Sequence, residues 1–260
     1  MYRRFTIFGF RAAQIIAVAM VAATFVAAVP HATAAVVVDG TRVVYPAAKR
    51  EVTLNIRNPS NTPSLVQAWL DAGDSRTKPG ESAVPFVLTP PLFRLDPGKS
   101  QSLRLVYTHD PLPQDRESVF WLNVLDIPPR AAANPDLPNQ LDMAFKHRMK
   151  VFFRPVTLPG SAADAPARLT WKLLSTGGKV VAIQASNPTP YHVSLAQITA
   201  TVAGHALSAK ADMVEPFASR RFDLPDPIVV PGNAAAVVEY WFVNDFGGSA
   251  NGTASASSAP

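Results

Sequence analysis

The histidines are the side chains best suited to acid–base or metal chemistry, and they are scattered along the chain. No two of the five form a pair with the spacing of a metal-binding helix, such as His-Glu-x-x-His. Cysteine is absent, which removes thiolate metal sites, cysteine nucleophiles and disulfides. The sequence therefore predicts no metal site, no cofactor and no catalytic residues, and it favours a protein that is not an enzyme. The histidines are His31, His109, His147, His192 and His205.

One short motif resembles a nucleotide-binding loop but lacks its essential glycine. Gly98-Lys99-Ser100 has the ending of a phosphate-binding loop, but the glycine required five positions earlier is Phe93. The segment is typical of a tight turn between two strands. A Gly-x-Ser-x-Gly nucleophile motif is also absent, and the acidic residues are spread as on an ordinary solvated surface.

The N-terminus is typical of a secretory signal peptide. Three arginines accompany an apolar, alanine-rich stretch over residues 12–29, and Ala32-Thr33-Ala34 has the small-residue pattern of a cleavage site. Residues 1–34 are therefore predicted to be removed after export to the periplasm, with an uncleaved membrane anchor as the alternative. The remaining chain has 21 basic and 19 acidic residues, because the leader carries three of the 24 basic and none of the 19 acidic ones. A net charge of +2 is too small for nucleic-acid binding by bulk charge.

The exported part of the chain reads as short strands separated by turns. Residues 52–57 and 103–107 alternate apolar and polar side chains, the pattern of a strand with one buried face. The 25 prolines argue against long helices, and turn signals recur about every 8–12 residues, as in immunoglobulin-like sandwiches. The expected fold is all-β with two such domains, over 35–157 and 158–246. The Gly, Ser, Ala and Asn residues of 247–260 predict a flexible tail.

Four segments in this order, after a signal peptide, resemble the PapD-like periplasmic chaperones of the chaperone–usher pathway, which assemble pili (fimbriae). The resemblance extends over essentially the whole exported chain. The segments are Thr41-Arg42-Val43-Val44-Tyr45-Pro46; Leu112 to Ser118 with Phe120-Trp121-Leu122-Asn123 and Ile127-Pro128-Pro129; Met149-Lys150-Val151-Phe152-Phe153-Arg154-Pro155; and Asn187-Pro188-Thr189-Pro190-Tyr191 with Asn244-Asp245-Phe246-Gly247.

The resemblance implies two immunoglobulin-like domains arranged as an L with a cleft between them. It implies that the clients are pilus subunits, each a sandwich that lacks its last strand. The chaperone would bind, fold and cap one subunit at a time by lending it a strand, and would then deliver it to an outer-membrane usher. The free-standing alternative is an exported sandwich protein that binds a surface carbohydrate or another ligand, and a hydrolase on the same scaffold is a third class.

The family resemblance assigns a donor strand and an anchor. The donor strand lies just before Lys150, where Leu141, Met143 and Phe145 share one face. Arg42 and Lys150 match the basic residues that bind the client's terminal carboxylate. Such a carboxylate accepts strong hydrogen bonds from guanidinium and ammonium groups. A donor strand with three exposed apolar side chains also predicts self-association of the unliganded protein.

The resemblance also assigns a structural ion-pair network to Glu117, Arg154 and Asp245, which would orient the two domains. A partly buried network of this kind specifies geometry more than it adds stability. The sequence does not identify the client, and it does not decide whether the peptide bond in Thr89-Pro90 is cis.

Overall fold

The computed structural model describes residues 36–129, 143–230 and 235–259. The predicted signal peptide and Leu141 lie outside these ranges. Within them the chain forms one short 3-10 helix, η1 (Pro166–Arg168), and a series of strands. The strands are β1 (Val37–Val38), β2 (Arg42–Pro46), β3 (Val52–Arg57), β4 (Ser64–Asp71), β5 (Phe86–Thr89), β6 (Leu92–Leu95), β7 (Ser100–Tyr107), β8 (Ser118–Ile127), β9 (Phe145–Arg154), β10 (Thr170–Thr176), β11 (Lys179–Ser186), β12 (Val193–Val202), β13 (His205–Ala209), β14 (Met213–Val214), β15 (Ser219–Val229), β16 (Ala236–Val243) and β17 (Ser249–Ala259).

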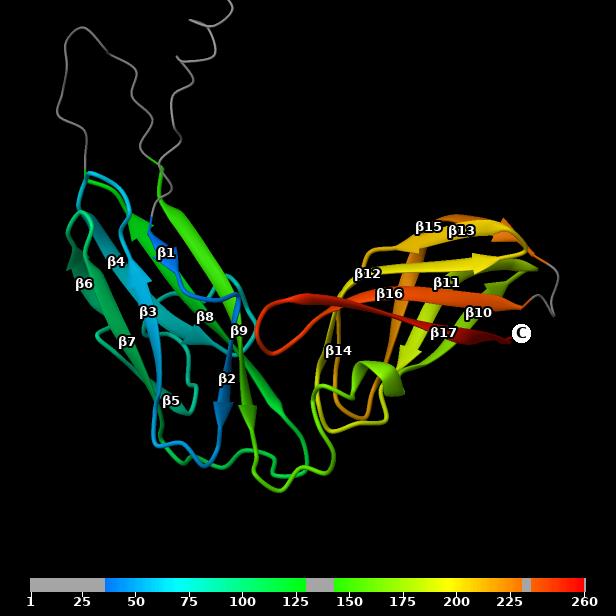
Figure 1. The fold of residues 1–260 in the computed structure, drawn as a ribbon, viewed down its shortest axis with the longest axis horizontal. Helices are drawn as coiled ribbons and strands as arrows, with labels where there is room; N and C mark the ends of the chain where they lie inside the picture. The colour runs from blue at the N-terminus through cyan, green and yellow to red at the C-terminus, as the bar shows by residue number, and fades with distance from the viewer. Residues whose placement is uncertain (1–35, 130–142, 231–234, 260) are drawn as a thin grey trace, which may run out of the picture. The chain divides into compact units, whose positions relative to one another are not determined.

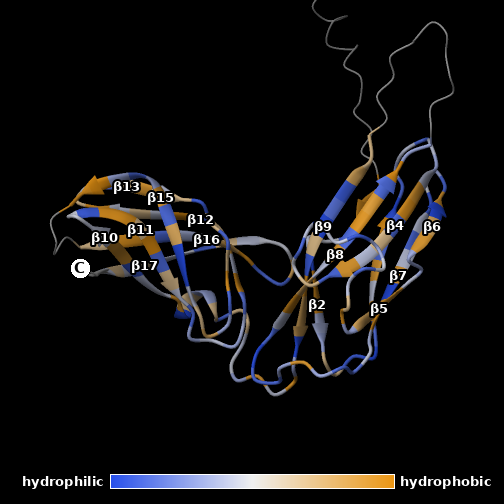
Figure 2. Cartoon of the chain, turned by 180° about the vertical axis from the view of Figure 1, so that it is seen from behind, coloured by the Kyte–Doolittle hydropathy of each residue, from blue (hydrophilic) through white to orange (hydrophobic). Residues whose placement is uncertain are grey.

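The first nine strands form a sandwich of two sheets (Figure 1). One sheet has the order β1-β3-β7-β5 and the other β2-β9-β8-β4-β6. The predicted alternation is present: Leu54 and Ile56 of β3 and Leu103 and Leu105 of β7 are buried, while the residues between them are exposed. Figure 2 shows the same alternation as bands of opposite hydropathy along the strands. Burial of one face of each sheet therefore builds a single apolar core.

The pairing of β2 with β9 is parallel, and it is shorter than β9 itself. It joins Arg42–Pro46 to Lys150–Arg154, with Arg42 directly opposite Lys150. On its other side, β9 pairs with β8 over Phe145–Phe153. β1 pairs with β3 in the opposite sheet rather than with β9. Within the described ranges, the edge of β9 over residues 145–149 consequently has no strand beside it.

The remaining strands form the second sandwich, with the order β13-β12-β16-β17-β10-β11-β15 and β14 beside β12. Its core is a separate cluster of buried side chains that includes Trp171, Ile183, Ile198 and Tyr240. The prediction of an all-β fold with two immunoglobulin-like sandwiches is confirmed. The peptide bond between Thr89 and Pro90 is cis, a point that the sequence leaves open.

The prediction of a flexible tail over 247–260 is wrong for most of that segment. Residues 249–259 form β17, which pairs antiparallel with β16 and parallel with β10. Its stability comes from two rows of backbone hydrogen bonds, so it needs little apolar burial of its own. Small residues are required there, because a Cβ at Gly252 would lie 2.6 Å from the ring of the buried Tyr240. The small residues that suggested a flexible tail are therefore also suited to a strand that packs against Tyr240.

In the described ranges there is no helix long and apolar enough to cross a membrane.

Candidate functional site

Arg42 and Lys150 lie side by side on the same face of their sheet, as their register requires. In β2 the alternate residues Val43 and Tyr45 point into the core, which directs Arg42 outward. In β9 Met149 and Val151 are buried, which directs Lys150 outward at the matching position. The structure therefore brings together the two cations that the sequence assigns to anchoring. Both side chains are half-buried.

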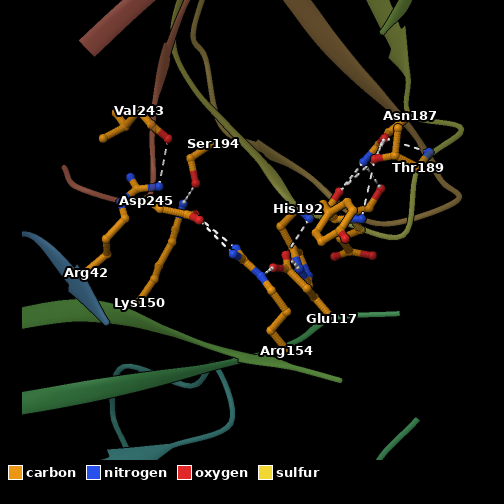
Figure 3. A network of polar contacts seen from close by, with 12 residues as sticks. Arg42, Glu117, Lys150, Arg154, Asn187, Thr189, His192, Ser194, Val243 and Asp245 are labelled. Atoms are coloured by element: carbon orange, nitrogen blue, oxygen red, sulfur yellow. Dashed lines mark hydrogen bonds and ion pairs between the residues drawn. The ribbon is translucent and has the colours of Figure 1, made fainter. Parts of the chain in front are cut away.

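Each cation is held by one neutral partner from the second sandwich (Figure 3). Arg42 Nη1 donates to the carbonyl of Val243 at 2.8 Å, and Lys150 Nζ donates to Ser194 Oγ at 3.3 Å. The Arg42 guanidinium also lies 5.7 Å from the centre of the Phe152 ring. Neither cation forms a salt bridge within the described residues, so both charges remain available to an external anion.

The surroundings of the two cations lower the pKa of both groups. Burial lowers the pKa of Arg42, and the negative charge of Asp245 opposes this effect. Burial likewise lowers the pKa of Lys150, and the positive charges of Arg42 and Arg220 add to it, while Asp212 opposes it. A bound carboxylate would relieve the repulsion between these neighbouring charges. The site is therefore electrostatically suited to an anion.

A cavity of about 290 Å³ adjoins Arg42. Its lining includes Phe152, His192, Phe242 and Asp245, whereas Lys150 is not part of the lining. The Nε atom of Arg42 is buried and has no hydrogen-bond partner among the described residues. An unused buried donor is costly, and a ligand oxygen would satisfy it. The guanidinium thus has spare hydrogen-bonding capacity on the side of an open space.

Glu117, Arg154 and Asp245 also come together, as predicted from the resemblance (Figure 3). Arg154 Nε donates to Glu117 Oε1 at 2.6 Å, and its two terminal nitrogens donate to the two oxygens of Asp245 at 2.7 and 3.0 Å. Burial alone would lower the pKa of Arg154, but the hydrogen bonds and charges of the two carboxylates raise it. Arg154 therefore carries its charge at every physiological pH and links strand β9 to the β16–β17 turn.

His192 also belongs to this network, although it lies just outside the family motifs. Its backbone N–H donates to Glu117 Oε2 at 2.8 Å, and its Nδ1 lies 3.3 Å from the same oxygen. The Glu117 side chain is 2% exposed, so these contacts replace water around its charge. A hydrogen bond from the Glu117 N–H to the carbonyl of Pro190 adds a backbone link at the same place. Only the adjacency of His192 to the Asn187–Tyr191 motif could have suggested its role.

The predicted donor residues are placed in part. Met143 and Phe145 are exposed, with 53% and 46% of their surface accessible, and Leu141 lies outside the described ranges. Phe145 begins β9, on the strand segment whose outer edge has no neighbour. Two exposed apolar side chains at alternate positions beside an unpaired strand edge are suited to binding another strand.

Comparison with known proteins identifies the family. The profile described as "Pili and flagellar-assembly chaperone, PapD N-terminal domain" matches residues 35–159, and "Pili assembly chaperone PapD, C-terminal domain" matches residues 164–254. The chain belongs to this family of periplasmic pilus-assembly chaperones, as the sequence motifs predicted. It is therefore a chaperone and not an enzyme.

Curated relatives match over nearly their full length. The chain is 41% identical to the chaperone protein FimB/FhaD of Bordetella pertussis over 88% of this chain and 91% of that protein. It is 39% identical to the probable fimbrial chaperone YadV of Escherichia coli, over 84% and 89% of the two chains.

Solved structures agree with these matches. The crystal structure of the YadV chaperone covers 85% of this chain and all of its own, with a TM-score of 0.70 and 36% identity. The SafB chaperone of Salmonella enterica, crystallised in complex with the SafA pilin, aligns with a TM-score of 0.68 and 31% identity over 85% and 95% of the two chains.

The Arg154→Ala variant is expected to lower the free energy of unfolding by about 3–5 kcal/mol, because it leaves the buried carboxylate of Glu117 without its cation. Urea denaturation followed by tryptophan fluorescence measures the loss. The matched control is Arg104→Ala, which removes an exposed partner of Glu51 and should cost less than about 1 kcal/mol. Equal losses in the two variants would show that the network does not stabilise the fold.

Proposed function

We propose that this chaperone holds one pilus subunit at a time by adding β9 to the subunit's incomplete sheet, with Arg42 and Lys150 binding the subunit's terminal carboxylate. The observation that carries the proposal is the open edge of β9 over residues 145–149, which ends where β2 begins. Unpaired backbone N–H and C=O groups on such an edge are a template for another strand.

The position of the two cations fits the end of a client strand. A strand laid along residues 145–149 of β9 cannot continue past Lys150, because β2 occupies the edge from that residue onward. Arg42 and Lys150 form the first pair of that β2–β9 ladder. A chain that ends at this point would place its carboxylate between a guanidinium and an ammonium group, and its direction would be parallel to β9.

The apolar side chains of the donor segment supply the affinity. Met143 and Phe145 are exposed in the unliganded chain, and each is worth about 1.5–3 kcal/mol when it becomes fully buried. Their alternation matches the period of a strand, so both would enter the same groove of the client. The ion pair at Lys150 would fix the register, and the apolar side chains would hold the client in it.

The relatives support this mode of action. SafB was crystallised with the SafA pilin, and the present chain shares its fold over most of its length. By extension, the client is a pilus subunit, bound one to one and passed to an outer-membrane usher. The signal peptide over residues 1–34 would bring the chaperone to the periplasm and be removed there.

The first test is recovery of a subunit from the periplasm. The subunit encoded beside this gene is expected to co-purify with the wild-type chain, and recovery should fall at least tenfold with Arg42→Ala or Lys150→Ala. Loss of one charge-assisted pair in a partly buried site is worth roughly 2–5 kcal/mol. Pili on the cell surface, seen by electron microscopy, report delivery to the usher.

The controls for this test are Lys172→Ala and Arg221→Ala, which remove exposed cations of the second sandwich. Both should recover the subunit as the wild type does. Undiminished recovery with folded Arg42→Ala and Lys150→Ala would reject the anchor. Recovery of no subunit by the wild type would reject the chaperone–pilin assignment for the neighbouring genes.

Binding of the subunit should also weaken as the pH rises. Only the protonated ammonium of Lys150 attracts a carboxylate, and burial places the pKa of this group below that of an ordinary lysine. The affinity should therefore fall at a lower pH than for an exposed lysine, as measured by titration calorimetry. Lys150→Arg should move this loss to higher pH. An affinity that is constant through the titration of Lys150 would exclude the ammonium from binding.

The donor side chains predict self-association in the absence of a client. We expect unliganded chains to associate through Met143 and Phe145 at high concentration, because exposed apolar groups on a free edge favour pairing. Met143→Ser combined with Phe145→Ser should give a monomer by light scattering and should also lose the subunit. The control is Val229→Ser, which removes an exposed apolar side chain at the end of β15. A strictly monomeric wild type would contradict self-association without affecting the client test.

A further inference from the structure

The outward face of β9 carries a row of four cations. Lys146, Arg148, Lys150 and Arg154 occupy positions of the same parity, while Met149, Val151 and Phe153 point into the core. Successive positions on one face of a strand are about 7 Å apart. A carboxylate that approaches this strand therefore meets several positive charges at closely spaced positions.

Because several cations lie along β9, the terminal carboxylate of a client strand could bind in more than one register. A slip by one residue would turn every client side chain to the wrong face, so the alternating pattern excludes it. A slip by two residues keeps every side chain on its proper face. It would move the terminal carboxylate from Arg42 and Lys150 to Arg148, which is also a good carboxylate ligand. The apolar pattern of the donor strand cannot distinguish these two registers.

Two of the four cations are paired with carboxylates, and a third donates to a backbone carbonyl. Arg154 is bound by Glu117 and Asp245, and Lys146 Nζ donates to the carbonyl of Ser75 at 2.9 Å. Arg148 Nη2 donates to Asp71 Oδ1 at 2.6 Å and to the carbonyl of Gly73 at 3.0 Å. Among the described residues, the one hydrogen-bond partner of Lys150 Nζ is the neutral hydroxyl of Ser194, at 3.3 Å.

Burial and further hydrogen bonds fix the Asp71 carboxylate in its position beside Arg148. It is completely buried at the end of β4, and it also accepts hydrogen bonds from Asn123 Nδ2 at 2.6 Å and from the Gly73 N–H at 2.7 Å. Burial alone would raise the pKa of Asp71, but the hydrogen bonds from Arg148 and Asn123 lower it. The carboxylate is therefore charged at physiological pH.

Trp121 restrains the same guanidinium from another side. The centre of its ring is 4.1 Å from the Arg148 guanidinium carbon and 5.5 Å from Lys150 Nζ. Stacking on an aromatic face stabilises a guanidinium. Arg148 is thus fixed by a carboxylate, a carbonyl and an aromatic ring, and the Arg148 side chain is only 20% exposed.

We propose that Asp71 is a positioning residue for client binding: by occupying Arg148, with Trp121 as a platform, it excludes the two-residue slip and leaves Lys150 as the anchor on this strand. This inference rests on the proposed function, since it concerns the register of the same complex. Asp71 does not touch the client in this scheme. It acts by removing a competing cation.

Cross-linking tests the proposal, and the subunit recovered with the wild-type chain serves as the probe. The chain has no cysteine, so His147→Cys gives a single thiol on β9. It is paired with single cysteines placed along the last residues of the subunit. With Asp71 intact, one subunit position should dominate and the position two residues nearer the subunit's C-terminus should give less than about a tenth of the disulfide product. With Asp71→Asn, the share of the product from that second position should rise severalfold, because a freed Arg148 competes with the anchor formed by Arg42 and Lys150.

The neutral double variant Asp71→Asn/Arg148→Met separates register control from stability, because it removes the buried charge together with its partner. It should restore the single register and recover the subunit within about twofold of the wild type. The proposal is overturned if folded Asp71→Asn keeps one register, or if the slipped product persists in the double variant. It is also overturned if the double variant loses the subunit, since Arg148 would then bind the client itself.

If Asp71→Asn does not fold, the double variant still tests the proposal, because a slipped product or loss of the subunit in that variant overturns it. If the wild type recovers no subunit, the proposed function is rejected, and the inference about Asp71, which depends on it, is rejected as well.

Discussion

The register of the parallel β2–β9 ladder is the constraint on which the candidate site depends. The ladder starts at Arg42 and Lys150, so it fixes two like charges side by side on one face. Among the described residues, the same starting point leaves residues 145–149 of β9 without a strand on that edge. In the proposed mode of binding, one feature of backbone pairing therefore sets both where a client strand lies and where it ends. Moving this ladder by a single residue would bury one cation in the core.

Placing two cations together has an electrostatic cost, and the surrounding contacts moderate it. Arg42 and Lys150 are held by a carbonyl and a hydroxyl, which orient them without neutralising them. Arg154, which lies four residues after Lys150 on β9, is instead neutralised by two carboxylates. The strand thus separates structural charges from available ones. The structural charge of Arg154 is paired with carboxylates, whereas the available charges of Arg42 and Lys150 have neutral partners.

Much of the fold could be predicted from the sequence, because alternation in β3 and β7 reports directly on which face is buried. The family motifs also predicted two groups of site residues, the pair Arg42 and Lys150 and the network of Glu117, Arg154 and Asp245. The contacts that orient them could not be predicted, since a backbone carbonyl such as that of Val243 has no sequence signature. The role of Asp71 could not be predicted from the sequence for a related reason. A single aspartate at the end of a strand looks like a surface residue until its burial beneath Arg148 is known.

The prediction for residues 247–260 was wrong for a different reason. Their composition suggested a flexible tail, whereas backbone pairing with β16 and β10 makes most of them a strand. β17 lies between β16 and β10, so the last residues of the chain form an interior strand of the sheet (Figure 1). Until those residues are in place, β16 and β10 each present an unpaired edge above an open core. The second domain is then itself a sandwich with a strand missing. A second domain without residues 249–259 would thus have the same kind of defect that the chaperone is proposed to cap in its clients.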